Sequence, residues 1–216
     1  MERNGCLPDV VTYNTLINYH SKEGHLNESQ RLFLKMTDKG IVPNSYSYNE
    51  LIVGFCKANK LEKGYLLVSQ TMEVAGLSDV VSYNTLINAL CKLRRTGTAY
   101  KLLSEMLQKG IVPDIVTYTT LINGFFEEGH PDLAEELFHE MWTEGFTPDV
   151  ITYTTVINHF CRMGRTDQAC DLLSEMVRKG INPDVASYNA LINRLCKSFR
   201  ISEAVELFEE MIESGC

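Results

Sequence analysis

The chain has 216 residues, of which 44% are hydrophobic and 22% are charged, and its formal net charge is −8. This composition is typical of a folded protein rather than a disordered one, and no apolar run approaches the roughly 18 residues that a membrane-spanning helix needs. A negative net charge by itself argues against nucleic-acid binding, so the distribution of charge must decide that question.

A period of 35 residues runs through the sequence. Tyrosine and isoleucine both follow it, at Tyr13, Tyr48, Tyr83, Tyr118, Tyr153 and Tyr188 and at Ile17, Ile52, Ile87, Ile122, Ile157 and Ile192. A fixed period of roughly 20 to 50 residues is typical of a solenoid of stacked repeats. In chain order we divide the sequence into the tail of a preceding repeat (1–9), five full repeats (10–44, 45–79, 80–114, 115–149 and 150–184) and a truncated repeat (185–216), which we interpret as an excerpt from a longer array.

Each repeat is predicted to form two α-helices. In the first repeat, Tyr13, Leu16, Ile17 and His20 recur at helical spacing and form a packing stripe, and a second such stripe lies within residues 26–36. The later repeats copy this arrangement, so the fold is expected to be an all-α solenoid of helical hairpins.

The expected helix ends carry their own signals. A carboxylate that can cap the open backbone amides precedes most first helices, at Asp9, Asp79, Asp114, Asp149 and Asp184. Glycines stand where the second helices should end, at Gly40, Gly110, Gly145, Gly180 and Gly215, and prolines follow most of them. In the second repeat Met72, Gly76 and Ser78 interrupt this pattern, so its final turn is expected to be distorted.

A second stripe on each first helix is mostly polar. In the first repeat it contains Val11, Asn18, Ser21 and Lys22 beside Asn14. A cation holds the same register in five repeats, at Lys22, Lys57, Lys92, Arg162 and Lys197, whereas Glu127 takes this place in the fourth. Because the acidic residues concentrate on the second helices, such a ladder can follow a phosphate backbone despite the net negative charge. The alternative is that these cations only complement the dipole at the helix C-terminus.

No enzyme, metal site or cofactor site is expected from the remaining polar residues. Cys56, Cys91, Cys161 and Cys196 share one place in their repeats, which Ser21 and Phe126 fill elsewhere, so we interpret them as buried thiols rather than metal ligands or disulfide partners. The histidines are scattered, and the pair of Glu136 and His139 has no second copy. Nothing assembles a nucleophile with a base, and no small-molecule substrate is expected.

The repeats resemble the pentatricopeptide repeat family. The resemblance lies in the runs VVTYNTLIN (10–18), VVSYNTLINALCK (80–92) and IVTYTTLINGFF (115–126), each followed by a second helix and then Lys-Gly-Ile-x-Pro-Asp or a close variant. It covers the whole chain and points to arrays built only of 35-residue repeats. The resemblance implies a right-handed superhelical solenoid of stacked antiparallel helix-turn-helix repeats, and a fragment of a longer plant-type RNA-binding protein of the mitochondrion or chloroplast.

The resemblance also implies the residues that would bind single-stranded RNA, one nucleotide per repeat. The fifth and last residues of a repeat would read the base, as the pairs Asn14 with Asn44, Asn49 with Asp79, Asn84 with Asp114, Thr119 with Asp149 and Thr154 with Asp184, and as Asn189 without its partner. The second residue would stack on the base, at Val11, Tyr46, Val81, Val116, Ile151 and Ala186. With the cation ladder on the phosphates, the expected site is 5′-(C/U)UUGG(pyrimidine)-3′, read in organellar RNA processing, stability or translation.

Two further expectations remain open to test. The alternative function is a protein-binding scaffold, although the regular pattern of Asn or Thr, Asp and Lys favours RNA over an irregular peptide groove. The terminal repeats are expected to expose apolar faces that suit neighbouring repeats, so end-to-end self-association is also expected.

Overall fold

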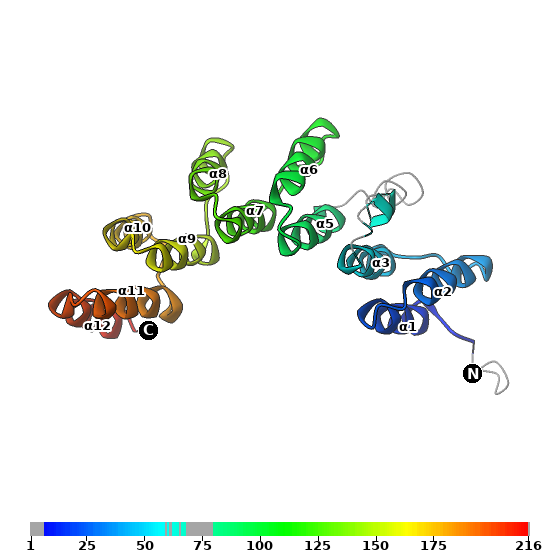
Figure 1. Cartoon of the computed structure of the whole chain (residues 1–216), viewed down its shortest axis with the longest axis horizontal. Helices are drawn as coiled ribbons and strands as arrows, with labels where there is room; N and C mark the ends of the chain where they lie inside the picture. The colour runs from blue at the N-terminus through cyan, green and yellow to red at the C-terminus, as the bar shows by residue number, and fades with distance from the viewer. Residues whose placement is uncertain (1–6, 59, 61, 65, 68–79, 216) are drawn as a thin grey trace. The chain divides into compact units, whose positions relative to one another are not determined.

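The computed structural model describes residues 7–58, 60, 62–64, 66–67 and 80–215. The helices defined in this part of the chain are α1 (Val10–Lys22), α2 (Leu26–Asp38), α3 (Ser45–Lys57), α5 (Val80–Lys92), α6 (Thr96–Gln108), α7 (Ile115–Glu128), α8 (Pro131–Thr143), α9 (Val150–Met163), α10 (Thr166–Arg178), α11 (Val185–Lys197) and α12 (Ile201–Glu213) (Figure 1). Within the same residues there is no strand, and none of the helices has the length and hydropathy of a membrane-spanning segment. The chain divides into two compact units, residues 1–124 and 125–216, which are described separately.

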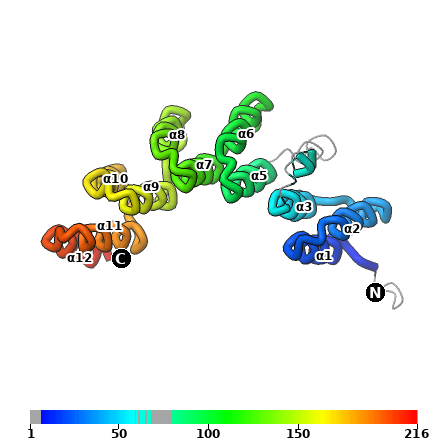
Figure 2. Tube along the Cα trace, in the orientation of Figure 1, coloured from blue at the N-terminus to red at the C-terminus, as the bar shows by residue number. Residues whose placement is uncertain are grey.

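In each of the two units, first helices pack against their own second helices and against the next first helix. In residues 1–124, α1 contacts α2 and α3, α3 contacts α5, and α5 contacts α6. In residues 125–216, α9 contacts α10 and α11, and α11 contacts α12. The tube in Figure 2 follows the chain as it alternates between first and second helices. The predicted all-α solenoid of helix-turn-helix repeats is therefore confirmed.

The 35-residue period of the sequence marks the core. Tyr83, Tyr118, Tyr153 and Tyr188 are at most 1% exposed, and Met36, Met106, Met141 and Met176 of the second helices are fully buried. The expected packing stripe holds in the later repeats but not at Leu16, which is 43% exposed although its counterparts Leu51 and Leu86 are buried. The physical reason is that α1 has no preceding first helix within the described residues, whereas α1 covers α3 and α3 covers α5.

Three of the buried tyrosines, Tyr83, Tyr153 and Tyr188, are anchored to a glutamate of the second helix by their hydroxyl groups. Tyr153 donates a hydrogen bond to Glu175 (3.1 Å), and Lys179 forms an ion pair with the same carboxylate (2.9 Å). Tyr83 makes the equivalent contact with Glu105 (3.1 Å). Burial, followed by the charge of Glu175, raises the pKa of Tyr153 well above its ordinary value, so the phenol stays protonated as a donor. The acidic residues of the second helices thus have a structural role away from the polar stripe.

Local capping chemistry sets the helix limits, as predicted. The predicted caps Asp9, Asp114, Asp149 and Asp184 each accept a hydrogen bond from a backbone amide in the first turn of the following helix (2.8 to 2.9 Å). Asn44, which was not among the predicted caps, makes the same contact at the start of α3 (3.1 Å). Gly145 follows α8 with φ of 84°, a conformation that residues with a Cβ avoid. The expected caps at Asp79 and the expected distortion at Met72, Gly76 and Ser78 lie outside the described residues.

The cysteine and serine register of the first helices belongs to the packing surface. Ser21 was assigned to the polar stripe, but it is 2% exposed and donates to Ser29 (3.2 Å), so that assignment is wrong. Cys56 and Cys161 are buried, and burial raises the pKa of both thiols to about 11. Cys196, in contrast to the expectation of a buried thiol, is exposed, because within the described residues no further first helix packs beyond α11.

Candidate nucleic-acid interface

Every residue expected to stack on a base is exposed. These residues are Val11, Tyr46, Val81, Val116, Ile151 and Ala186. The side chains larger than alanine are between 49% and 67% exposed. Each is the second residue of a first helix and lies in its first turn, which fixes its direction relative to the start of that helix. Tyr46 is further held by Asn18, whose Nδ2 donates to the Tyr46 hydroxyl (2.9 Å). Apolar or aromatic surface is therefore presented to solvent at a constant register.

The structure brings the two members of three expected base-reading pairs into contact. Asn14 Nδ2 donates to Asn44 Oδ1 (3.2 Å), and Asn84 Nδ2 donates to Asp114 Oδ1 (3.0 Å). In the fifth repeat Thr154 Oγ1 donates to Asp184 Oδ1 at a longer 3.4 Å. The fifth residue of a repeat and the residue that caps the next first helix therefore form one polar unit.

The remaining members of these pairs are placed individually. Asn49 is half-buried in α3, and its expected partner Asp79 lies outside the described residues. Thr119 and Asp149 are both half-buried and belong to different compact units. Asn189 is exposed in α11.

Two of the residues expected to read bases lie deeper than a simple surface stripe. Asn14 is 5% exposed and Thr154 is 8% exposed, because the next first helix packs beside them. The side-chain oxygens of Asn14 and Asn49 are buried and have no hydrogen-bond partner within the part of the chain that the structure describes. Proteins satisfy most such atoms, so these amides have capacity for a ligand donor after a small side-chain movement.

A set of positioning residues was missed in the sequence. Thr117 Oγ1 lies 2.6 Å from Asn84 Oδ1, and Ser187 Oγ lies 2.6 Å from Thr154 Oγ1, so a hydroxyl from the next repeat orients each reading residue. The same hydroxyls contact the capping carboxylates Asp114 (2.9 Å) and Asp184 (2.7 Å). A periodic signal was available, since the third residue of every repeat is a hydroxyl residue, at Thr12, Ser47, Ser82, Thr117, Thr152 and Ser187.

The capping carboxylates are charged hydrogen-bond acceptors. Burial alone would raise the pKa of Asp114, but hydrogen bonds from Asn84 and Thr117 outweigh it and hold the pKa below the ordinary value. The pKa of Asp184 is lowered in the same way, against burial, by Ser187 and Thr154. The side-chain contacts of both carboxylates converge on Oδ1, so Oδ2 retains room for an N–H donor.

The cation ladder is present but is not uniform. Lys22, Lys57, Lys92 and Lys197 are exposed and make no ion pair within the described residues. Arg162 is paired with Glu127 (2.7 Å), the acidic residue that replaces a cation in the fourth repeat. His159 lies 3.9 Å from the same carboxylate and stacks on Phe126 with ring centroids 4.6 Å apart. Burial, and then the charge of Arg162, lowers the pKa of His159, so this imidazole adds no positive charge at neutral pH.

Among the described residues, no group of three or more His, Cys, Asp or Glu side chains is arranged as metal ligands would be. The site therefore consists of hydrogen-bonding side chains, exposed aliphatic groups and cations in one repeating register. Such a site can bind a linear polyanion that carries a planar group at every step.

The fold and this repeating register define a helical-repeat protein whose first helices present the same types of side chain at the same places. Comparison with family models identifies the class: the model described as the PPR repeat family matches residues 8–57, 78–127, 113–162, 148–197 and 183–216, and the PPR repeat model matches residues 46–70. The chain belongs to the pentatricopeptide repeat (PPR) family. No curated protein gives a significant match.

Solved structures show the same fold. The chain is similar to the pentatricopeptide repeat protein PPR10 from maize, with a TM-score of 0.72 and 24% identity over 100% of this chain and 36% of that chain. PPR10 in complex with an 18-nt psaJ RNA element gives a TM-score of 0.69 and 24% identity, over 98% of this chain and 34% of that chain. The PPR domain of Arabidopsis thaliana protein-only RNase P 1 in complex with tRNA gives a TM-score of 0.50 and 17% identity. This match covers 94% of this chain and 89% of that domain. The chain thus spans about a third of the length of PPR10.

Proposed function

We propose that the chain binds single-stranded RNA with one nucleotide per repeat. The observation that carries the proposal is the hydrogen-bonded pair formed by the fifth and last residues of a repeat, as in Asn84 with Asp114, beside an exposed aliphatic residue such as Val81. This arrangement offers a base a polar edge and an apolar face at once. PPR10, which shares the fold, has been solved with an 18-nt RNA element, and this supports the assignment.

The charge state of the capping residue limits which bases each repeat can bind. An ionised Asp only accepts hydrogen bonds, so Asp114 and Asp184 suit the N–H group on the pairing edge of uracil or guanine. The amide of Asn84 favours uracil beside Asp114, and the shorter Thr154 leaves room for guanine beside Asp184. Asn44 can donate or accept, which accommodates cytosine or uracil. Extended over all repeats, the proposed site is 5′-(C/U)UUGG(pyrimidine)-3′.

The biological setting is proposed on the family relationship. We infer that the chain acts by binding rather than by catalysis, in RNA processing, stability or translation in a mitochondrion or chloroplast. The free lysines of the first helices, such as Lys57 and Lys92, supply affinity for the RNA backbone without reading its sequence.

Fluorescence anisotropy with short oligonucleotides tests the proposal. The probes are CUUGGU, UUUUUU and CUUAAU as RNA, and the DNA version of the first. We expect the wild-type chain to bind CUUGGU most tightly, and the double variant Thr119→Asn, Thr154→Asn to shift its preference toward UUUUUU. The matched control is Thr120→Asn, Thr155→Asn, which makes the same change one residue further along the same helices.

The outcomes distinguish recognition of individual bases from RNA binding that does not depend on sequence. A loss of discrimination that is confined to the first double variant supports base reading by Thr119 and Thr154. Equal binding to all four probes, or no binding at low salt, contradicts the proposal and would leave a protein-binding scaffold as the function to test.

A further inference from the structure

A hollow of about 440 Å³ lies between α9 and α11, on the same stripe as the cation ladder. Its walls include Asn158, Arg162, Ala190, Asn193, Arg194 and Lys197, and no carboxylate is among the residues that line it. Three cationic and two amide side chains around one opening make a site that suits an anion with several acceptor oxygens.

Arg194 is the member of this set that the sequence did not indicate. The equivalent residues in the other repeats are Tyr19, Gly54, Ala89, Gly124 and His159, so no periodic pattern marks the place as basic. In the structure, Arg194 Nε donates to Thr166 Oγ1 (3.3 Å), which anchors the guanidinium across the gap between α11 and α10. A methyl group built on Gly164 would lie 2.8 Å from the terminal Nη2 of Arg194, so the guanidinium lies close to the backbone at the end of α9.

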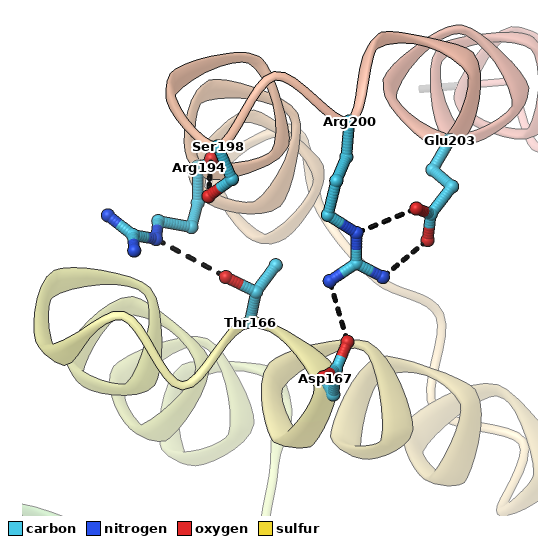
Figure 3. Close-up of polar contacts among 6 residues, drawn as sticks. All are labelled: Thr166, Asp167, Arg194, Ser198, Arg200 and Glu203. Carbon is cyan, nitrogen blue, oxygen red and sulfur yellow. Dashed lines mark hydrogen bonds and ion pairs between the residues drawn. The ribbon is translucent and has the colours of Figure 1, made fainter.

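A neighbouring arginine shows what a purely structural role looks like. Arg200 forms hydrogen-bonded ion pairs with Asp167 (2.6 Å) and Glu203 (2.5 Å), and Figure 3 shows it enclosed between these two carboxylates. In the same view the Arg194 guanidinium has one hydrogen bond drawn, from Nε to the hydroxyl of Thr166. Within the described residues Arg194 has no carboxylate partner, so its charge is not neutralised by the protein.

We propose that this hollow binds one phosphate group of the RNA backbone, with Arg194 as the principal ligand and Lys197 as the second. Because α9 and α11 are the first helices of the fifth and sixth repeats, the phosphate is the one that links nucleotides five and six of the bound RNA. A guanidinium with its Nε anchored still presents its terminal N–H groups, and this planar arrangement matches phosphate oxygens. Arg162 joins the site only when it exchanges Glu127 for phosphate. This inference rests on the proposed RNA binding and assigns a backbone contact within it.

A double-mutant cycle between the protein and the RNA tests the contact. The RNA is CUUGGU, either unmodified or with an uncharged methylphosphonate between nucleotides five and six, and the control RNA carries that group between nucleotides one and two. We expect Arg194→Gln to weaken binding of unmodified RNA about tenfold, and to have little further effect once the linkage between nucleotides five and six is uncharged.

Matched variants separate the contact from general charge. Arg178→Gln removes the same charge from an exposed position at the end of α10 and should leave affinity within about twofold. Arg194→Lys keeps the charge without the planar fork and should give an intermediate loss. Circular dichroism and thermal unfolding check that each variant is folded. Equal losses for Arg194→Gln on all three RNAs, or equal effects of Arg194→Gln and Arg178→Gln, overturn the proposal.

A second measurement keeps the phosphate site testable if the RNA proposal itself fails. Sodium phosphate is titrated against sodium chloride at constant ionic strength, and NMR follows the amides of Gly164 and Thr166 and the Nε–H of Arg194. Saturable shifts at these groups that disappear in Arg194→Gln support the site even without RNA binding. If these signals do not move in the wild-type chain, the hollow is not a phosphate site.

Discussion

The fifth residue of a repeat contacts the cap of the next helix and is also the residue proposed to read a base, as Asn84 illustrates. Its amide nitrogen donates to Asp114 and its oxygen accepts from the Thr117 hydroxyl, so a single rotamer is fixed before any ligand arrives. A side chain that is already ordered loses less conformational entropy when it binds. At the residue scale, capping of the next helix and the proposed base recognition therefore use one hydrogen-bonded unit.

The capping carboxylates predict how stability depends on pH. The pKa of Asp114 is lowered from 3.8, so its stabilisation is complete above that value and is lost as the pH falls through the lower folded-state pKa. Asp114→Asn keeps a capping oxygen, as Asn44 does, but does not titrate. We expect the stability advantage of the wild-type chain over this variant, about 1 kcal/mol or less at pH 7, to shrink as the pH falls below 3.8.

Thermal unfolding at pH 7 and pH 3 measures this difference. Asp38→Asn, at the exposed end of α2, is the control for a general change in charge. A wild-type advantage over Asp114→Asn that is unchanged at low pH would show that the carboxylate contributes nothing specific.

A glycine that allows close approach of two first helices gives a second prediction. A Cβ on Gly124 would lie 2.7 Å from Cys91 Sγ and 2.8 Å from Thr96 Oγ1, so Gly124→Ala should destabilise the chain by about 1 to 3 kcal/mol through overpacking. Gly97 in α6 has open space around it, so Gly97→Ala should be neutral or stabilise by up to about 1 kcal/mol through helix propensity. Chemical denaturation of both variants compares the two effects, and equal behaviour would contradict the packing argument.

At the scale of the helix, each first helix divides its surface between packing and recognition. The face that contains Ser21 and Cys161 is buried, whereas the first turn presents Val11 or Ile151 to solvent. Cations near the C-terminal end would lie about three turns from the stacking residue, which suits a strand that crosses the helix with its base near one end and its phosphate near the other. In the proposed binding mode the helix would set the distance between base and backbone contacts.

Glu127 interrupts this arrangement in α7 and predicts a gain of affinity on mutation. Glu127→Gln would release Arg162 from its ion pair, add one cation to the ladder and remove one negative charge from the RNA path. We expect RNA binding to tighten by about two- to fivefold and the slope of log affinity against log salt to steepen by about 0.7. Anisotropy titrations at several salt concentrations measure both quantities.

Glu136→Gln is the matched control, because Glu136 is exposed on the second helix α8. If both variants gain affinity equally, the effect comes from net charge and not from the pair between Glu127 and Arg162.

At the scale of the whole molecule, apolar side chains that are buried on a helix with neighbours on both sides are exposed on a helix with one neighbour. Phe208 of α12 is 51% exposed, whereas its counterpart Leu173 in α10 is 3% exposed. α10 packs against both α9 and α11, but within the described residues α12 packs only against α11. The face of α12 that contains Phe208 is therefore suited to an apolar neighbour.

This exposure predicts concentration-dependent self-association. We expect the mass of the chain in light scattering to rise with concentration, and Phe208→Glu to reduce this rise because a charge would have to be buried in the contact. Val177→Glu is the control, since Val177 is 47% exposed on α10 and lies outside the face of α12. A wild-type chain that remains monomeric at high concentration would contradict end-to-end association.

The sequence by itself determined the repeat, the helical hairpin and the helix limits. These features depend on local rules: the spacing of Tyr13 and Ile17 sets a helix face, Asp9 caps the amides that follow it, and Gly145 adopts the conformation that ends a helix. The hydroxyl series that includes Thr117 was equally visible as a period, but its role required the contact with Asn84 from the preceding repeat.

Only the tertiary structure decided burial and pairing between repeats. The depth of Thr154, the burial of Ser21 and the exposure of Leu16 depend on whether a neighbouring helix covers each residue, which helical spacing alone does not give. The pair between Arg162 and Glu127 joins residues 35 positions apart, and the charge left free on Arg194 depends on which carboxylates lie within reach. Such interactions form between side chains on different helices, so the physical reason is that they arise from the packing of one repeat on the next.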